Sequence, residues 1–241
     1  MNVLHVRHSK SHRAEYALAI DKSTLPDLGG APTSSNVIAK HIRTAIVDGS
    51  FKEGEPIRQD EIGALFNVSK IPVREALKRL EAEGLVEFRR NRGVFVTMLS
   101  EPEIEEIFEV RAILESAAIQ QSVPKMTDAT FERAFDHYQL FLRDKETAGW
   151  STLNWRFHSS LYEDAGKPFL LQQIRAVNDR IERYLRVQLT LADGKQKSDD
   201  EHLAILHACK LGEASKAAKL THDHIMGACT SLLKSQPSRS S

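Results

Sequence analysis

The chain has 241 residues, its 33 Lys and Arg are balanced by 33 Asp and Glu, and 41% of its residues are hydrophobic. This composition is typical of a globular chain with one large or two ordinary domains, and it excludes a largely disordered chain. Since no apolar run is long enough to span a membrane and the two cysteines lack a metal or redox spacing, we expect a reduced, cytoplasmic protein that is neither exported nor membrane-bound.

The chain begins with residues 1–33, in which basic and histidine side chains mix with glycine and proline. We expect a flexible arm there. A helix follows, with Ser35 or Asn36 as its cap and its end near Gly49. A second, short helix is predicted over residues 60–66. Its predicted inner residues are Ile62, Leu65 and Phe66.

A third helix is predicted to follow a tight turn at Asn67 and Val68. Ser69 can cap it, and Pro72 lies in its first turn, where the missing N–H breaks no intrahelical bond. Free backbone N–H groups at the Ser69 end attract phosphate. The buried stripe of this helix consists of Val73, Ala76, Leu77 and Leu80. A basic row beside it consists of Lys70, Arg74 and Lys78.

Two strands, predicted over residues 85–89 and 94–98, surround a turn at residues 90–93. The pattern of helix, turn, helix and hairpin predicts a winged helix-turn-helix, whose last helix enters the major groove of DNA while a basic hairpin tip follows the backbone. Residues 34–99 contain eleven Lys and Arg against nine Asp and Glu. The prediction of DNA binding therefore depends on where the charges lie rather than on their sum.

Residues 34–99 resemble the GntR family of bacterial transcription regulators, and its FadR-like subfamily in particular, through the runs IRTAIVDGSFKEGEPI and VSKIPVREALKRLEAEGLV. The resemblance implies a homodimer that binds a two-fold symmetric double-stranded DNA operator. Lys70 stands where the family usually has Arg, and a lysine lacks the guanidinium that forms bidentate hydrogen bonds with guanine. Arg58, before the second helix, can meet a phosphate or solvent. The implied DNA-binding residues are Ser69, Lys70, Pro72 and Arg74 at the reading end and Arg90, Asn91, Arg92 and Gly93 in the wing.

Long helical patterns replace strands in residues 100–235, where Pro102 suits the first turn of a new helix. We expect an all-helical bundle there and a flexible, serine-rich tail in residues 236–241. The predicted fold is therefore mainly α, with an N-terminal winged helix-turn-helix and a bundle of about six helices. The six predicted helices cover residues 102–122, 127–147, 151–165, 168–191, 198–211 and 213–234.

Polar side chains interrupt the apolar faces of three of these helices. Asn154 and His158 lie one turn apart beside an inward stripe, and His202 and His224 lie on the buried faces of two later helices. A lone inward histidine is more often a hydrogen-bonded core residue. Three imidazoles with unpaired nitrogens would cost free energy, however, and one divalent ion would satisfy all of them.

Residues 102–234 resemble the FadR-type C-terminal ligand-binding domain, called FCD, through FEVRAILE, NWRFH, EHLAIL and AAKLTHDHI. In many members the corresponding positions bind a divalent metal through an Asp and three His. The resemblance implies a metal site here, with zinc as the first choice and nickel and manganese as alternatives. Its ligands would be Asn154, His158, His202 and His224. Asn154 replaces the Asp, and its uncharged carbonyl oxygen lowers the expected affinity.

Arg111 lies on the buried stripe of the first bundle helix, and a buried guanidinium needs an anion. One partner is Glu115, four residues later on the same helix. The other, implied by the resemblance, is the carboxylate of a small organic acid effector, which Arg111 would clamp.

Together these features predict a metabolite-responsive, DNA-binding transcription regulator whose effector alters operator binding. The resemblance implies a repressor more readily than an activator, because repression is the commoner outcome among such relatives. A regulator with a purely structural metal or a metal-free pocket is an alternative. The other alternative is a metal-dependent enzyme acting on a small carboxylate. Because we find no inward Glu or Asp beside the histidines to act as a general base, we expect no enzyme.

Overall fold

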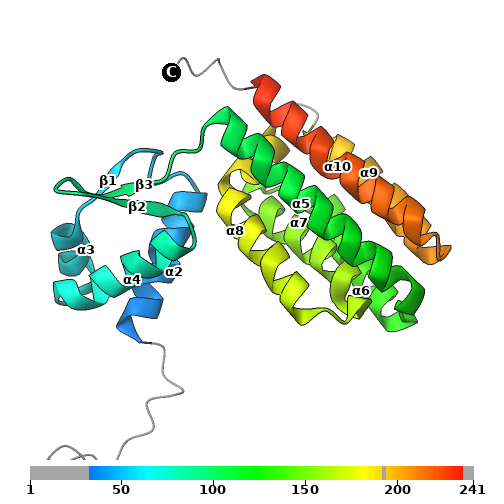
Figure 1. Cartoon of the computed structure of the whole chain (residues 1–241), viewed down its shortest axis with the longest axis horizontal. Helices are drawn as coiled ribbons and strands as arrows, with labels where there is room; N and C mark the ends of the chain where they lie inside the picture. The colour runs from blue at the N-terminus through cyan, green and yellow to red at the C-terminus, as the bar shows by residue number, and fades with distance from the viewer. Residues whose placement is uncertain (1–32, 192–193, 236–241) are drawn as a thin grey trace, which may run out of the picture. The chain divides into compact units, whose positions relative to one another are not determined.

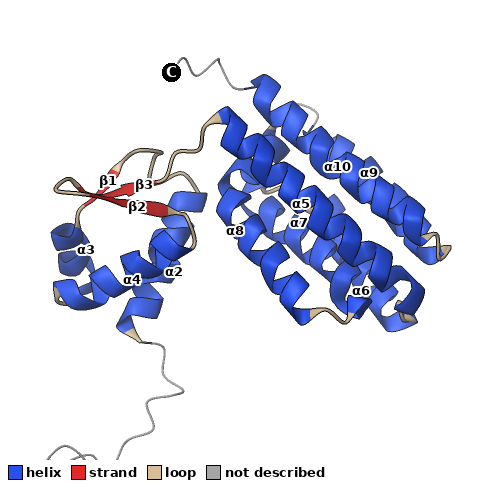
Figure 2. Cartoon of the chain, in the orientation of Figure 1, coloured by secondary structure: helices blue, strands red, loops and turns tan. Residues whose placement is uncertain are grey.

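The computed structural model describes residues 33–191 and 194–235 (Figure 1). Of the arm expected over residues 1–33 only Thr33 is described, and the tail expected over residues 236–241 lies outside the described residues. Residues 34–99 combine helices with a small sheet, whereas residues 100–235 contain helices and no strand among the described residues (Figure 2). We call these two parts the winged helix and the helical bundle.

The winged helix contains a three-stranded antiparallel sheet in the order β1-β3-β2. Its elements are α2 Ser34–Val47, β1 Pro56–Ile57, α3 Gln59–Phe66, α4 Lys70–Ala82, β2 Val86–Arg89 and β3 Gly93–Val96. Asn91 (φ 59°), in the turn between β2 and β3, and Gly93 (φ 100°), the first residue of β3, have the positive φ that these two residue types tolerate. Strand β1 was not predicted, because two residues are too few to show an alternating pattern.

The core of the winged helix is one apolar cluster that contains the whole predicted stripe of α4, which is confirmed. The prediction that Leu65 is an inner residue was wrong, since its side chain is 76% exposed. Ile62 is buried as predicted, Phe66 packs partly buried against the cluster, and α3 also buries Gly63. A Cβ atom at Gly63 would lie 3.0 Å from the carbonyl oxygen of Val68. This close approach to the turn keeps the Ile62 side of α3 inward and leaves Leu65 in solvent.

The helix caps differ from the prediction at two places. Helix α2 begins at Ser34, so Ser35 lies inside the helix, where it is buried. Ser69 does precede α4, but its side chain makes no capping hydrogen bond. By contrast, Ser100 forms a reciprocal capping box with Glu103 at the start of the bundle, with 2.9 Å from the Ser100 backbone nitrogen to the Glu103 carboxylate.

The helical bundle has the predicted six α-helices within the described residues, and the mainly α fold class is confirmed. They are α5 Glu101–Ser122, α6 Asp128–Arg143, α7 Thr147–Tyr162, α8 Pro168–Thr190, α9 Gly194–Lys210 and α10 Ala214–Ser235, with short 3₁₀ turns η3 Val123–Lys125 and η4 Glu163–Ala165. Helices α7 and α9 begin earlier than predicted. The first turn of each contains a glycine, a residue that disfavours helices and that a sequence pattern therefore indicates as a break. In the described part of the chain no helix combines the length and apolar character that a membrane span requires.

Candidate functional site

A layer of polar side chains crosses the interior of the helical bundle between two apolar clusters. Helices α5, α8 and α10 each contribute apolar residues to both clusters. The boundary between the two clusters lies near Glu115 on α5, near Asn178 on α8, and near Thr221 and His224 on α10. Every side chain of this polar layer is at most 5% exposed. Its members are Arg111, Glu115, Asn154, His158, Asn178, His202, Thr221 and His224.

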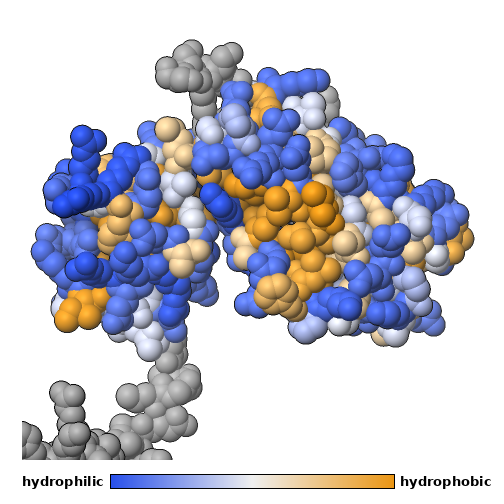
Figure 3. All heavy atoms as spheres, in the orientation of Figure 1, coloured by the Kyte–Doolittle hydropathy of each residue, from blue (hydrophilic) through white to orange (hydrophobic). Residues whose placement is uncertain are grey.

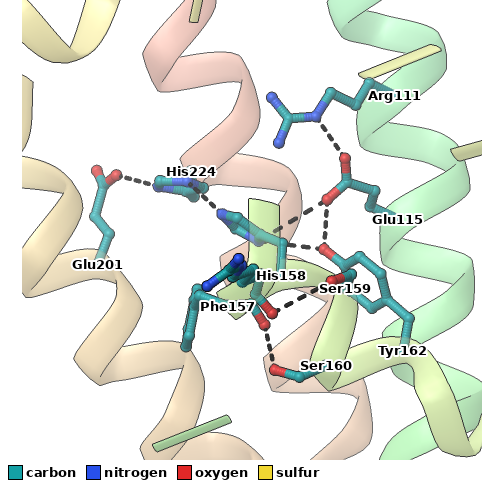
Figure 4. A network of polar contacts seen from close by, with 10 residues as sticks. Arg111, Glu115, Phe157, His158, Ser159, Ser160, Tyr162, Glu201 and His224 are labelled. Atoms are coloured by element: carbon teal, nitrogen blue, oxygen red, sulfur yellow. Dashed lines mark hydrogen bonds and ion pairs between the residues drawn. The ribbon is translucent and has the colours of Figure 1, made fainter. Parts of the chain in front are cut away.

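The three predicted histidines converge in this layer from α7, α9 and α10. One ligand atom of each lies within 4.8 Å of the other two, and the Nε2 atoms of His158 and His224 are 3.2 Å apart (Figure 4). Two imidazole nitrogens bound to one zinc ion at about 2.0 to 2.1 Å would be roughly 3.3 Å apart. The spacing of His158 and His224 therefore suits two ligands of a single ion.

The hydrogen bonds of His158 determine which of its nitrogens carries the proton. Burial lowers the pKa of His158 well below its usual 6.5, so the ring is neutral. Burial likewise raises the pKa of Tyr162 well above 10, and its hydroxyl donates to Glu115. The Tyr162 oxygen is then an acceptor for Nδ1–H of His158, 3.3 Å away. Nε2 of His158 is left with a lone pair that faces the cluster.

His224 is oriented by a carboxylate on the neighbouring helix. Its Nδ1 lies 2.7 Å from Oε2 of Glu201, and because a carboxylate only accepts, Nδ1 carries the hydrogen (Figure 4). Nε2 of His224 then faces Nε2 of His158. Two lone pairs at this distance repel each other unless a cation, either a proton or a metal ion, lies between them.

His202 and Asn154 have polar atoms without partners. Both ring nitrogens of His202 and Oδ1 of Asn154 are buried with no hydrogen bond. Burial lowers the pKa of His202 well below 6.5, so it too presents a lone pair. Three imidazoles and an amide oxygen are ligands that a divalent transition-metal ion accepts, and the unpaired atoms are those that such an ion would satisfy. The residues present thus fit a metal.

Arg111 forms the internal ion pair that was one of its two predicted partnerships. Its Nε lies 2.5 Å from Oε1 of Glu115, and both side chains are almost fully buried. Within the Arg111 side chain, Nε is the one guanidinium nitrogen that has a hydrogen-bond partner among the described residues. Figure 4 shows the two Nη atoms on the side of the guanidinium that points away from Glu115. The ion pair therefore leaves two donors for another acceptor.

Glu115 corrects the expectation that no acidic side chain points inward beside the histidines. It is fully buried, and its Oε2 lies 3.9 Å from Nδ1 of His158. Its oxygens are already engaged by Arg111 and Tyr162, so it is not a free general base. Spacing could have indicated this network, because Glu115 follows Arg111 by four residues and Tyr162 follows His158 by four.

The polar layer also contains residues that the sequence analysis missed. Oδ1 of Asn178 and Oγ1 of Thr221 are buried without hydrogen-bond partners, as Oδ1 of Asn154 is. The signal for Asn178 was its place between Ile174 and Ile181 on the inward face of α8. No comparable signal marked Glu201, because its contact joins two different helices.

The predicted DNA-binding residues lie on the surface of the winged helix. One groove is lined by Arg58 and Lys70 together with Arg92 and Gly93 of the wing. Arg58 pairs with Glu61 at 3.6 Å, and Lys70 pairs with Asp60 at 2.6 Å. All four of these side chains are about 70% exposed, so the pairs stabilise the fold little and each carboxylate can give way to a phosphate.

The other predicted DNA-binding residues do not line this groove. Ser69 and Arg74 are exposed near the first turn of α4, and Pro72 is half-buried there. Arg74 has no hydrogen bond or ion pair among the described residues. Arg90 and Asn91 are exposed at the tip of the wing. Lys78, the last member of the basic row, instead bonds Glu81 at 2.8 Å and lies over the ring of Phe88.

Comparison with known proteins identifies both parts. Residues 34–96 match the bacterial regulatory proteins of the gntR family, and residues 106–227 match the FCD domain. The chain belongs to the GntR family. This GntR regulator is 29% identical over 167 residues to the Nta operon transcriptional regulator of Aminobacter aminovorans, which covers 61% of this chain and 78% of the relative.

Two further comparisons agree. Over 196 residues the GntR regulator is 24% identical to the HTH-type transcriptional repressor GlaR of Escherichia coli, covering 77% of this chain and 89% of the relative. The crystal structure of a transcriptional regulator GntR from Rhodococcus sp. RHA1 superposes with a TM-score of 0.71 at 25% identity, covering 84% of this chain and 99% of that one. The protein is therefore a DNA-binding transcription regulator with an FCD domain, and not an enzyme.

Proposed function

We propose that this GntR regulator is a homodimeric, metabolite-responsive repressor whose helical bundle binds a small organic acid beside a divalent metal ion. The observation that carries the proposal is the convergence of His158, His202 and His224 in a buried layer that also contains a guanidinium. Repression is favoured because the relative GlaR is named a repressor.

The metal ligands in this proposal are the three histidines and Asn154. Zinc is the first choice, with nickel and manganese as alternatives, since imidazole nitrogen suits all three ions. The bound ion would supply a positive centre for an anionic oxygen. Because all four protein ligands are uncharged, an anion that approaches the ion meets no competing carboxylate among them.

Arg111 is the proposed contact for the effector carboxylate. Its Nε holds Glu115, which fixes the guanidinium plane, and its two Nη groups remain as donors. A carboxylate placed there would gain charge-assisted hydrogen bonds in a buried setting. The same ion pair also supports the alternative in which Arg111 only stabilises the bundle, so the effector experiment must distinguish the two.

The proposed dimer would use the face of the bundle formed by α5 and α8. Figure 3 shows a hydrophobic area on this face, and Val110 and Ile113 of α5 are 41% and 64% exposed. Glu106 of α5 and Arg180 of α8 line a groove with Val110, so acidic and basic groups flank the apolar residues. A two-fold contact can pair the acid of one subunit with the base of the other.

The proposed DNA contacts are the nine surface residues of the winged helix. The exposed start of α4 would read base edges through Ser69, Lys70, Pro72 and Arg74, while Arg58 would contact phosphate. The wing residues Arg90, Asn91, Arg92 and Gly93 would follow the backbone. An effector that binds one arrangement of the two subunits more tightly would then change operator occupancy.

The decisive test is a thermal-shift screen of small organic acids on the full chain, with and without a chelator. An acid that binds the folded state raises the melting temperature, and we expect the chelator to abolish this rise. Sedimentation of the same sample should give the mass of a dimer. An acid whose effect survives the chelator would remove the metal from the mechanism, and a hit that is unchanged in Arg111→Met would leave Arg111 with a structural role only.

A further inference from the structure

Glu201 lies outside the converging ligand atoms, yet it is the one carboxylate among the described residues that is hydrogen-bonded to a histidine of the cluster. We propose that Glu201 is a positioning residue, which holds His224 in the Nδ1–H form with Nε2 directed at the cluster and thereby sets the affinity of the site for a metal ion. The part that concerns metal rests on the function proposed above. The part that concerns the tautomer does not.

The geometry of the contact carries the first half of the inference. Nδ1 of His224 lies 2.7 Å from Oε2 of Glu201, a short distance for a charge-assisted hydrogen bond. A neutral imidazole has one N–H, and the partner of one nitrogen decides which nitrogen keeps its lone pair. With Nδ1–H held by Glu201, the lone pair falls on Nε2, 3.2 Å from Nε2 of His158.

The charge of Glu201 carries the second half. The residues that would touch the ion are three imidazoles and one amide, and the nearby carboxylate of Glu115 already pairs with Arg111. Apart from His224, the one ion-pair partner of Glu201 among the described residues is Lys197, whose side chain is 48% exposed and whose Nζ lies 3.7 Å from Oε1 of Glu201. Through its hydrogen bond to His224, Glu201 can make that ring a better electron donor without entering the core.

The three histidines are held in different ways, which makes Glu201 a specific element rather than a general one. His158 is oriented by the hydroxyl of Tyr162, and His202 has no hydrogen bond to either nitrogen. The His202 ring is held by packing against Phe141 and Phe157, with ring centroids 5.2 and 4.3 Å away. His224 is the one of the three that a carboxylate holds directly.

Burial of the carboxylate does not explain the contact. The side chain of Glu201 is 31% exposed, so water could satisfy its oxygens in the absence of His224. The imidazole is only 5% exposed, and it is the group that depends on the hydrogen bond. The chain also provides a matched control in Asp200, the adjacent exposed carboxylate on α9, whose one hydrogen bond within the described part of the chain is to Gln196 at 3.4 Å.

The first measurement is the imidazole nitrogen NMR spectrum of the metal-free, full-length protein at a pH where the rings are neutral. We expect the Nδ1–H signature for His224 in the wild type and in Glu201→Gln, whose amide oxygen still accepts. Glu201→Ala should show loss of that signature, and Asp200→Ala should retain it. An Nδ1–H signature in Glu201→Ala that equals the wild type would overturn the inference.

The second measurement is the zinc dissociation constant, obtained by competition with a chromophoric chelator. Glu201→Ala should bind zinc about 10- to 100-fold more weakly, and Glu201→Gln should fall between it and the wild type. An equal loss in Asp200→Ala would assign the effect to surface charge and overturn the inference. A wild type that binds no zinc, nickel or manganese would instead sink the proposed metal site, while the NMR result would still decide the role of Glu201.

Discussion

The two parts of this GntR regulator differ in where they keep their polar groups. Among the described residues of the winged helix, Ser35 is the one buried polar residue, and the predicted DNA contacts lie on the surface. The helical bundle contains a whole polar layer in its interior, including an ion pair and three histidines. Surface contacts can change without loss of stability, whereas buried polar groups affect folding and binding together.

The difference between the two parts lies in what their binding groups cost the fold. Solvent already satisfies an exposed Arg or Lys, so placing it costs the fold little. An imidazole nitrogen or an amide oxygen buried without a partner costs free energy in every molecule that lacks a ligand. The bundle tolerates several such atoms, which is expected where a ligand supplies the missing contacts.

The largest expected effect comes from Glu115→Ala, which leaves Arg111 buried without its anion. Breaking a buried ion pair in this way should lower the free energy of unfolding by about 3 to 5 kcal/mol. The double variant Arg111→Met with Glu115→Leu should recover most of the loss. In the winged helix, Asp60→Ala breaks the exposed pair with Lys70 and should cost less than about 1 kcal/mol. Urea unfolding in the presence of a chelator measures the free energy of unfolding of each variant. Equal losses in Glu115→Ala and Asp60→Ala would contradict the difference between the buried and the exposed ion pair.

Removal of a proposed metal ligand comes next. His202→Ala should weaken metal binding by at least about a hundredfold, equivalent to roughly 2.7 kcal/mol, while the metal-free protein stays folded. His207→Ala, on the exposed side of the same helix, provides the control and should bind metal normally. Atomic absorption after dialysis gives the metal content of each, and an unchanged content in His202→Ala would show that the ligand assignment is wrong.

On the winged helix, Arg74→Ala should weaken operator binding by about 1 to 3 kcal/mol, because a charged contact at the reading end is lost. Its melting temperature should not change, since the side chain is exposed and has no partner among the described residues. Arg156→Ala, an exposed arginine on α7, serves as the control. A gel-shift titration that finds equal affinity for all three proteins would remove Arg74 from the interface.

The smallest expected effect compares two serines at helix starts. Ser100→Ala removes a capping box and should cost about 1 kcal/mol of unfolding free energy. Ser69→Ala removes no capping hydrogen bond and should cost less than about 0.5 kcal/mol. Because Ser69 is also a predicted DNA contact, its substitution should be visible in operator binding and not in denaturation. A larger stability loss at Ser69 than at Ser100 would contradict the structure.

Much of the fold could be predicted from spacing in the sequence. The stripe of α4 and the six bundle helices were found because a period of 3.6 residues identifies the inward face of each helix. The same reasoning placed His158, His202 and His224 on buried faces, where the structure has them. The starts of α7 and α9, strand β1 and the exposure of Leu65 were missed, since each depends on a short or neighbouring segment rather than on a period.

Periodicity assigns each residue to a face of its own helix, because that depends on the chain's local geometry alone. Periodicity does not say which helices are neighbours, or which residues of neighbouring helices lie at the same level along the bundle. The contacts of His158 with His224 and of His224 with Glu201 join residues 66 and 23 positions apart, and they exist because α7, α9 and α10 bring these side chains to one level of the bundle. Sequence periodicity was sufficient to identify buried polar residues, while packing between helices selected their partners, since a hydrogen bond depends on distances of tenths of an ångström between separate elements.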